Sequence, residues 1–545
     1  MKQYLKKTVY LVTAILFFCN SCSNNFLDLS NPDTISPANF PATIADMELL
    51  VTSCYAHVGD FNLYGKRVMA KGPCVSDHTF DLAFPDPQWI DLGTNNYHPA
   101  DDWFETLWFG YYEVVNAANM VLEEADKINT DKFSDADLAR LEQIRGEAYF
   151  WRGWAYQQLV QFWGEGYPCN GDGDKQGVII FTSMPTNTQD MNRGRSTVNE
   201  VYEQVLSDYD EAEKRLPDSW KADADKSRPT TFSVRSFRGQ VYLFQGNNES
   251  AKTDLKNVID KSGKSLLPFD EYSKMFNEDQ TKFNNESIQE INFGDYASSG
   301  WGVWDGGTGS MHAMLISLYV LRDNDKDNPD GGESLGWSNV FFHDGNIARF
   351  GSDPRLYITS VPVGTRLCID GDSATEVKYN FSGDTKGWAV KKYNPLSYST
   401  YSVGPLSTPI NMYLMRLADV YLMYAEACQA TNDETNAREY VNKVRRRAYN
   451  LPINSPSAVD YTSSGTQLRD DIREERFLEL CAEGVQHWCD VCRWKTLDQE
   501  IKKWYPVTNL AGPPVYSSKS LYYPIPKKEM LNNTAIKQST GYEGM

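Results

Sequence analysis

The stretch FETLWFGYYEVVNAANMVLEEA, residues 104–125, decides the fold class of this chain. Its apolar residues recur three and four positions apart, which is the spacing of one face of an α-helix. Similar stripes run through residues 44–58, 138–162, 201–216 and 414–428. The sequence therefore predicts a mainly α-helical protein. Tryptophans that lie on these stripes are expected to be packing residues: Trp108, Trp151, Trp154 and Trp163.

Two segments share a further pattern of small residues that indicates paired helices. The first contains Gly239, Tyr242, Gly246, Ala251, Leu255 and Val258, and the second Ala425, Cys428, Asn432, Ala437, Val441 and Val444. Small residues let two helices approach closely, and a Gly or Asn between them permits a tight turn, as in tetratricopeptide units. With two degenerate units, around residues 44–125 and 138–216, the pattern predicts a helical-repeat scaffold.

The N-terminus has the pattern of a lipoprotein export signal. Lys2, Lys6 and Lys7 precede an apolar run over residues 9–18, and Ser21 places a small residue directly before Cys22. The apolar run is shorter than the roughly 20 residues that span a bilayer. We therefore expect residues 1–21 to be removed and Cys22 to become a lipid anchor in a membrane. Cleavage at Cys19 is the alternative, but bulky Phe18 stands where a small residue is wanted.

The charge and cysteine patterns exclude several functions. A net charge of −20 repels polyanions, so nucleic acid is not an expected partner. The densest basic run, Arg445–Arg447, is interpreted as the solvated face of a helix. Cys489 and Cys492 lack a second pair of zinc ligands at a suitable spacing and are expected to be buried thiols or one local disulfide. No metal or other cofactor is predicted.

The composition also divides the chain into regions. Residues 22–263 form an N-terminal helical region, and residues 264–545 form a C-terminal region. Within the latter, residues 264–410 are rich in Gly, Asn, Asp and Trp and are predicted to be a loop-rich insertion, followed by helices over residues 411–500. A second long loop covers residues 72–102. Loops this long commonly carry function, because a rigid scaffold presents their side chains.

Four segments, in order along the chain, resemble the SusD/RagB family. The N-terminal Ser21-Cys22 with Phe26-Leu27-Asp28 is similar to the start of that family, and residues 145–164 resemble its R-A-x-R-A-x-x-Y helix. Residues 473–494 resemble its E-R-x-x-E-L-x-x-E-G segment, and Tyr523-Pro524-Ile525-Pro526 its closing Y-P-I-P motif. Gln486 stands where the third segment usually has an arginine.

The resemblance implies a SusD-like fold and a non-catalytic function. A member of this family is expected to be a lipid-anchored protein of the outer membrane that faces the cell surface and binds an oligosaccharide. It would form a lid on a TonB-dependent transporter, with its tetratricopeptide side toward the barrel. A peptide or glycopeptide cargo, and a tethered glycoside hydrolase, are the alternatives.

Exposed aromatic rings are the candidate glycan-binding residues, because sugar C–H faces stack on them while short polar side chains bond the hydroxyls. One loop supplies Tyr296, Trp301 and Trp304 with Asp295 and Asp305, and the other supplies Trp89, Asn96 and Tyr97. The alternative is that these rings fix their loops to the scaffold.

Two clusters of acidic residues have simpler interpretations than metal binding or catalysis. The loop Asp323–Glu333 is rich in oxygen ligands, but it lacks the glycine and glutamate of a calcium-binding loop and is interpreted as a solvated turn. Asp101, Asp102 and Glu105 are interpreted as residues at a helix N-terminus, where carboxylates interact favourably with the helix dipole. A hydrolase would need two carboxylates facing one sugar.

Overall fold

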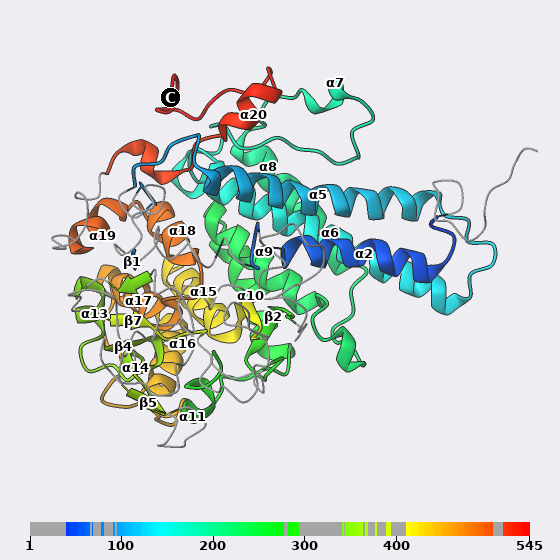
Figure 1. Cartoon of the computed structure of the whole chain (residues 1–545). Helices are drawn as coiled ribbons and strands as arrows, with labels where there is room; N and C mark the ends of the chain where they lie inside the picture. Colours follow the sequence, from blue (N-terminus) through cyan, green and yellow to red (C-terminus); the bar gives the residue numbers. More distant parts are fainter. Residues whose placement is uncertain are drawn as a thin grey trace, which may run out of the picture.

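The computed structural model places one continuous body of helices with a smaller strand-containing part (Figure 1). It describes residues 40–545 apart from 61, 66–67, 69–77, 81–90, 93–94, 277–281, 294–339, 343, 363–365, 369–375, 379–387, 394–409 and 505–515. Within this described part, none of the helices is both long and apolar enough to cross a bilayer.

Four long helices precede the tetratricopeptide-like pairs in the described part of the chain, and three of them begin at a capping box. They are α2 (Ile44–Val58), α5 (Asp102–Lys127), α6 (Asp135–Trp163) and α8 (Val198–Glu213). Thr43, Ser134 and Thr197 each accept the backbone N–H of the third helical residue, whose carboxylate bonds back to the cap. Helices α2, α5 and α6 lie side by side, and α8 packs on α6. The predicted helical stripes are confirmed here.

The two tetratricopeptide-like pairs are confirmed as antiparallel helix pairs. They are α9 (Thr231–Gln245) with α10 (Asn248–Lys261), and α15 (Leu417–Ala430) with α16 (Glu434–Ala448). Gly246 and Asn432, between the helices, adopt φ of 79° and 61°, the left-handed region that favours these residue types. Helix α10 also packs on α15, so the two pairs join into one scaffold although some 160 residues of chain separate them.

The strands form one four-stranded sheet and two ribbons, all antiparallel. The sheet has the order β1-β3-β7-β4, from β1 (His78–Phe80), β3 (Val340–Phe342), β7 (Trp388–Val390) and β4 (Ser360–Pro362). One ribbon pairs β5 (Arg366–Cys368) with β6 (Glu376–Lys378), and the other pairs β2 (Ser287–Ile291) with β8 (Met412–Arg416).

The predicted helical stripe over residues 414–428 is wrong at its beginning. Residues 414–416 belong to β8, and α15 starts only at Leu417. The pairing of β8 with β2 supplies backbone hydrogen bonds that a local helix would otherwise supply, and the apolar spacing within so short a run cannot separate the two.

The C-terminal region returns to the N-terminal helices. It contains α17 (Gly465–Leu480), α18 (Gln486–Arg493), α19 (Leu497–Trp504), η5 (Ser518–Leu521) and α20 (Lys527–Asn532). The tail between η5 and α20 is buried: the Tyr523 N–H donates to the Phe162 carbonyl, and the Trp163 indole donates to the Pro524 carbonyl. The closing segment thus completes the aromatic core around α5 and α6.

Short elements complete the chain: η1 (Pro168–Asn170), α7 (Thr188–Met191), η2 (Asp223–Asp225), α11 (Phe269–Tyr272), α13 (Asp344–Phe350) and α14 (Leu356–Thr359). The core lies between the long helices. Trp108, Trp151, Trp154 and Trp163 are all buried in it, which confirms their predicted packing role.

At Gly239 the backbone of α9 lies close against α10, and this contact provides a test of the repeat. A Cβ added there would lie 2.7 Å from side-chain atoms of Leu255, which is fully buried. We expect Gly239→Val to lower the unfolding free energy by about 2 kcal/mol, because overpacking forces the two helices apart.

The midpoint of urea unfolding, followed by circular dichroism, measures this effect. Gly194→Ala is the matched control, since its Cβ would meet no atom closer than 3.6 Å, and it should leave the midpoint unchanged. Equal midpoints for Gly239→Val and the native chain would mean that close approach of the two helices is not required.

Candidate functional site

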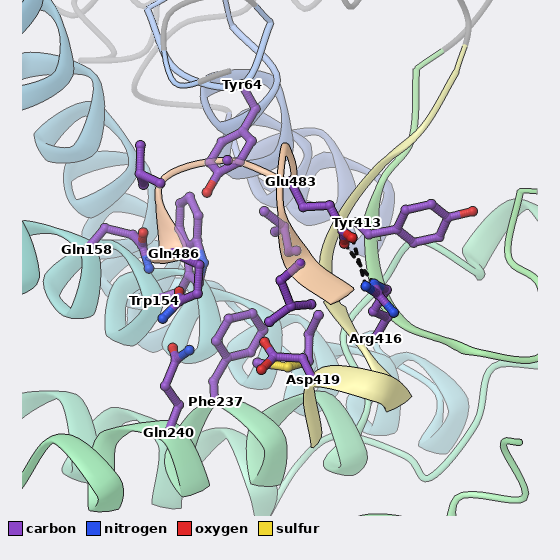
Figure 2. A pocket seen from close by; sticks show the side chains of 15 residues that line it. Tyr64, Trp154, Gln158, Phe237, Gln240, Tyr413, Arg416, Asp419, Glu483 and Gln486 are labelled. Atoms are coloured by element: carbon purple, nitrogen blue, oxygen red, sulfur yellow. Dashed lines mark hydrogen bonds and ion pairs between the residues drawn. The ribbon is translucent and has the colours of Figure 1, made fainter. Parts of the chain in front are cut away.

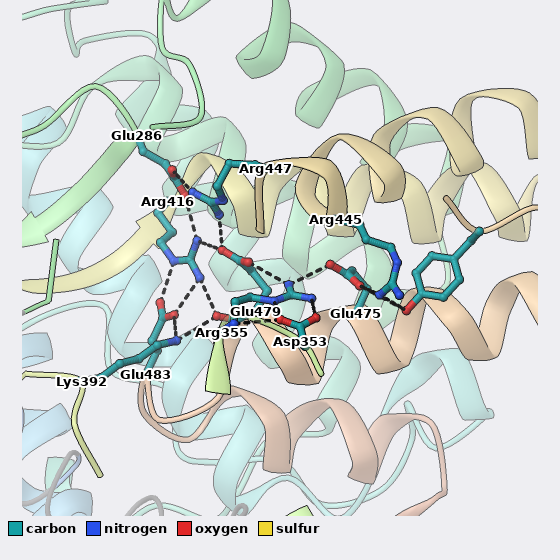
Figure 3. Close-up of polar contacts among 11 residues, drawn as sticks. Glu286, Asp353, Arg355, Lys392, Arg416, Arg445, Arg447, Glu475, Glu479 and Glu483 are labelled. Carbon is teal, nitrogen blue, oxygen red and sulfur yellow. Dashed lines mark hydrogen bonds and ion pairs between the residues drawn. The ribbon is translucent and has the colours of Figure 1, made fainter. Parts of the chain in front are cut away.

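A buried network of ion pairs joins the strand-containing part to the helical scaffold. Five cations and five carboxylates take part, and their side chains converge in Figure 3: Arg355, Lys392, Arg416, Arg445, Arg447, Glu286, Asp353, Glu475, Glu479 and Glu483. We call this set the Glu479 cluster. The numbers of positive and negative groups balance, as buried charges require.

Glu479, on α17, contacts more cations than any other carboxylate of the cluster. It pairs with Arg416 at 2.7 Å, with Arg355 at 3.0 Å and with Arg447. Burial alone would raise the pKa of Glu479, but Arg447, Arg416 and Arg355 together hold that pKa far below its usual range. Glu479 is therefore ionised at neutral pH.

A second group of ion pairs, next to the first, fixes α18. Arg476 of α17 pairs with Asp419 at 2.7 Å and with Asp490 at 2.9 Å. Arg493 bonds both oxygens of Glu426 at 2.7 Å, and the indole of Trp494 donates to the same carboxylate at 2.8 Å. Such a two-pronged arginine contact is geometrically specific as well as strong.

Cys489 and Cys492 are buried free thiols on α18, as the packing interpretation predicts. Burial raises the pKa of both thiols well above the usual value, which disfavours the reactive thiolate. Within the described residues, no group of three or more His, Cys, Asp or Glu side chains is placed to hold a metal ion.

The interpretation of Arg445–Arg447 as a solvated face is wrong. Arg446 and Arg447 are only 3% and 2% exposed, and each arginine has a carboxylate partner. Arg445 pairs with Glu475, Arg446 with Asp460 and Arg447 with Glu286. These partners come from distant segments, so the charge pattern of α16 by itself could not reveal them.

The sheet brings the roots of the two predicted binding loops together. Phe80 at the end of β1 is the register partner of Val340 at the start of β3. Each of these two residues borders a segment outside the described residues: the segment after Phe80 contains Trp89, and the segment before Val340 contains Trp301. The pair Ser360 and Val390 lies at the same end of the sheet as Phe80 and Val340, because β3, β7 and β4 are antiparallel neighbours. We call this the loop-bearing end of the sheet.

Exposed and half-buried aromatic rings lie beside this sheet. Tyr357 of α14 is 60% exposed, and its ring centroid lies 6.1 Å from that of half-buried Trp388, with 53° between the ring planes. The Lys391 ammonium donates to the Tyr357 carbonyl at 2.7 Å. Two rings and an amine thus share a surface at the sheet, and none of the three was singled out from the sequence.

The Glu479 cluster holds this surface from beneath. Lys392, next to Lys391, is buried and pairs with Glu483 at 2.8 Å. Arg355, two residues before Tyr357, is fully buried and pairs with Asp353 at 2.7 Å and with Glu475 at 2.8 Å. The buried residue fixes the backbone in each case, while half-buried Lys391 and exposed Tyr357 border the surface.

A narrow cavity lies on the other side of the cluster, between α6, α9, β8 and the turn before α18 (Figure 2). Its lining includes the amides of Gln158, Gln240 and Gln486, and Arg416 and Glu483 of the cluster reach it. The volume is about 50 Å³, which is room for a few water molecules and too little for a sugar ring. The cavity is therefore not a glycan site.

Most of the predicted glycan-binding residues lie outside the described residues: Trp89, Asp295, Tyr296, Trp301, Trp304 and Asp305. Cys22 and the loop Asp323–Glu333 lie outside them as well. Asn96 is described and exposed, and its amide contacts Asp91 and His98 at 3.1 Å.

The prediction of an exposed Tyr97 ring is wrong. Tyr97 has no exposed surface, and its ring packs edge-on against Phe104 and Tyr523, at centroid distances of 5.5 and 5.4 Å. Its hydroxyl donates to the Asn95 side chain at 2.7 Å. The closing segment of the chain covers the ring, which loop composition could not indicate, so Tyr97 cannot stack on a sugar.

Comparisons with known proteins agree with this architecture. A family model described as "Starch-binding associating with outer membrane" matches residues 25–243. SusD-like protein P38 of Formosa agariphila is 25% identical over 99% of this chain and 100% of its own length. A SusD-like protein of Bacteroides ovatus is 24% identical over 91% of this chain and 83% of its own. This chain is therefore similar to SusD-like proteins over nearly its whole length.

Solved structures show the same fold. A laminarin binding SusD-like protein has a TM-score of 0.73 at 22% identity, and covers 92% of this chain and 100% of its own. Surface glycan-binding protein A from Bacteroides fluxus has a TM-score of 0.72 at 18% identity, with the same coverage. The predicted SusD-like helical-repeat fold is confirmed.

The structure also explains the segment that carried the SusD-like resemblance. Glu475, Arg476, Glu479, Glu483 and Asp490 of residues 473–494 all take part in the buried ion pairs. Glu475, Arg476 and Glu479 lie on α17, Glu483 follows in the turn and Asp490 lies on α18. Their partners come from both the repeat helices and the strands. The motif therefore serves to join the parts of the fold.

The Glu426 pair predicts a pH dependence of stability. Burial would raise the pKa of Glu426, but Arg493, and then Arg476 and Trp494, lower it from 4.5 to about 2. As the pH falls, Glu426 is therefore protonated near pH 4.5 in the unfolded chain but only near pH 2 in the folded protein. The stabilisation is fully present above pH 4.5, and is lost as the pH falls toward 2, by up to about 3 kcal/mol.

Urea unfolding of the native chain and of Glu426→Gln, between pH 2.5 and 7, measures this contribution. The variant should be less stable at pH 7, and the difference between the two should shrink below pH 4.5. Glu249→Gln, at a side chain that is 75% exposed, should keep the full acid dependence of the native chain. A Glu426→Gln curve parallel to the native curve would contradict the assigned shift.

Proposed function

We propose that this protein is a non-catalytic glycan-binding lipoprotein of the outer membrane. It captures an oligosaccharide and delivers it to a TonB-dependent transporter. The match of residues 25–243 to a family model described as "Starch-binding associating with outer membrane" supports this proposal. The fold is shared with a protein described as laminarin binding, which fits a glycan as the class of ligand.

The observation that carries the proposal is the pairing of Phe80 with Val340. The segment that follows Phe80 contains Trp89, and the segment that precedes Val340 contains Tyr296, Trp301 and Trp304. We propose that these aromatic residues, some 200 positions apart in the sequence, contribute to one site. A site assembled from two such loops suits an extended ligand such as an oligosaccharide, which needs several stacking faces in a row.

Tyr357 and Trp388 extend this proposed surface from below. Their rings are accessible, Trp388 lies on β7 of the sheet and Tyr357 on α14 directly before β4, and the Lys391 ammonium beside them can bond sugar hydroxyls. In the proposed site the loop residues Trp301 and Trp304 stack on the sugar from one side, with Asp295, Asp305 and Asn96 as partners for its hydroxyls.

The acidic residues at the start of α5 fit a protein without catalysis. Asp101 is the N-cap of α5 and accepts the His98 N–H at 3.2 Å. Glu105, in the first turn, pairs with Lys528 of α20 at 3.0 Å. These carboxylates therefore have structural partners, whereas a hydrolase would direct two of them at one sugar.

Loss of the loop tryptophans tests the glycan site. The chain without its first 22 residues is titrated by calorimetry with neutral and acidic oligosaccharides and with peptides, laminarin fragments included. Trp301→Ala with Trp304→Ala should weaken binding of the best neutral oligosaccharide by roughly thirtyfold or more, since a lost stacking anchor costs about 2 kcal/mol. The melting temperature should barely change.

Tyr516→Ala is the matched control, because Tyr516 is 42% exposed and lies in none of the strands of the sheet. It should bind like the native chain. A double variant that stays folded and binds normally would place the site elsewhere, and one that unfolds would show the rings to be packing residues. Binding heat with peptides but not with sugars would establish a peptide cargo. Cleavage of the oligosaccharide during the titration would establish an enzyme.

Lipid anchoring is tested separately by Cys22→Ala. The mature native protein should sediment with membranes, and the variant should become soluble, because one lipidated residue is the proposed anchor. The experiment belongs in cells without the partner transporter, which could otherwise retain the protein. A variant that still sediments, and is released only by detergent, would contradict the lipoprotein assignment.

A further inference from the structure

A second hollow lies on the helical half, away from the four-stranded sheet. It has a volume of about 220 Å³ and is enclosed by the connection between α8 and α9, the residue after α10 and the turn that leads into β2. We call it the Trp220 groove. Its lining combines Trp220 and Phe283 with Lys226, Lys264 and the hydroxyl of Ser262. None of the strands β1, β3, β4 or β7 contributes to it.

Lys264 gives the groove an unusual cation. The side chain is half-buried, and within the described residues its ammonium makes a single hydrogen bond, to the Asn284 carbonyl at 3.2 Å. An ammonium has three N–H donors, so two remain for a ligand. Burial lowers the pKa of Lys264, Glu290 opposes that shift, and Lys226 adds to it. An anion placed beside Lys264 would relieve both the burial and the repulsion.

The other charges of the groove already have partners. Arg228 is neutralised by Glu147 at 2.7 Å, Asp225 at 2.8 Å and Glu48 at 3.0 Å. Glu290 accepts hydrogen bonds from the Phe283 N–H at 2.8 Å and the Asn411 amide at 2.7 Å. Lys226 pairs with Asp223 at 2.8 Å, and the exposed Asp218 carboxylate at the rim accepts the Thr231 hydroxyl at 2.5 Å. Lys264 is therefore the half-buried charge without an ion-pair partner among the described lining residues, in a chain whose net charge is −20.

Two aromatic rings accompany this cation. The half-buried Trp220 is held by its indole N–H, which donates to the Pro229 carbonyl at 3.0 Å, and by the Arg140 guanidinium 5.2 Å from its ring centroid. Phe283 has a φ of 51°, a strained conformation for a bulky residue. Backbone strain of this kind concentrates at binding sites, where the rest of the structure maintains it.

The volume of the Trp220 groove suits one sugar ring. Another hollow, of about 260 Å³, adjoins the groove and shares Arg228 and Glu290 with it. Each is smaller than the roughly 300 Å³ at which pockets for drug-sized ligands begin. The lining of this adjoining hollow includes hydroxyl and amide groups, from Tyr55, Ser227 and Asn292.

We propose that the Trp220 groove is a second carbohydrate site that binds an acidic sugar residue, whose carboxylate or sulfate contacts Lys264 while its ring stacks on Trp220 and Phe283. The adjoining hollow takes the next sugar of the chain. This inference goes beyond the proposed function, because the groove uses other residues than the loop-bearing end of the sheet. An acidic glycan would be held at two places on one molecule.

Calorimetry with the chain that starts after Cys22 tests the groove. The probes are a galacturonate trimer for the carboxylate, a sulfated galactan tetrasaccharide for the sulfate, laminaritetraose as the neutral sugar and polyglutamate as an anion without sugar rings. We expect one acidic sugar to bind more tightly than the neutral one, and its affinity to fall as salt is added. Lys264→Gln and Trp220→Ala should each weaken that binding by about tenfold or more.

Phe283→Gly separates a binding role from a structural one. Glycine adopts a φ of 51° without strain, so the melting temperature should be unchanged or higher, while acidic sugar binding weakens. This variant and Lys264→Gln decide the matter if Trp220→Ala fails to fold. Lys132→Gln, at an exposed lysine in the α5–α6 connection, is the charge-matched control and should bind normally.

The outcomes separate this groove from the proposed site at the sheet. Binding of the acidic sugar that survives Trp301→Ala with Trp304→Ala, but not Lys264→Gln, supports the groove whatever becomes of the neutral ligand. Equal binding of acidic and neutral sugars, equal binding of polyglutamate, or native affinity in Lys264→Gln and Phe283→Gly would overturn the proposal.

Discussion

The ion pairs around Glu479 are the constraint on which the rest of the structure depends. Arg355 comes from the segment before α14, Arg416 from β8 and Arg447 from α16, and all three meet one carboxylate on α17. Removing one partner would leave several buried charges uncompensated. The resulting loss of stability is much larger than the net stabilisation that the intact pair contributes. The elements can therefore assemble in only one arrangement, and we infer that this specificity is the role of the cluster.

The cluster links that arrangement to function through neighbours in sequence. Lys392 is buried in it while Lys391 is half-buried, and Arg355 is buried while Tyr357 is exposed. A rigid foundation beneath exposed rings lowers the entropy that a ligand would otherwise lose in ordering them. The proposed glycan surface thus combines variable loops with a fixed base, and the Trp220 groove uses a similar plan, with Phe283 held in a strained conformation beside β2.

The prediction from sequence was most accurate where the determining interactions are local. The stripe over residues 44–58 coincides with α2, and Gly246 and Asn432 lie at the turns where they were expected. The prediction was wrong where contacts with distant segments determine the secondary structure or the burial of a residue. Leu414 joins a strand because β2 pairs with it, Tyr97 is buried because the tail at Tyr523 covers it, and Arg447 is buried because Glu286 neutralises it.

The sequence by itself determined the helical class, the paired-helix repeats and the resemblance to the SusD-like family, since apolar spacing and turn residues act within a few positions of each other. Only the tertiary structure decided which charges are buried and which loops share a root. Glu286 and Arg447, or Phe80 and Val340, are brought together by packing across the whole chain. A spacing pattern holds no information on such contacts, because whether a charge is buried depends on where its partner folds.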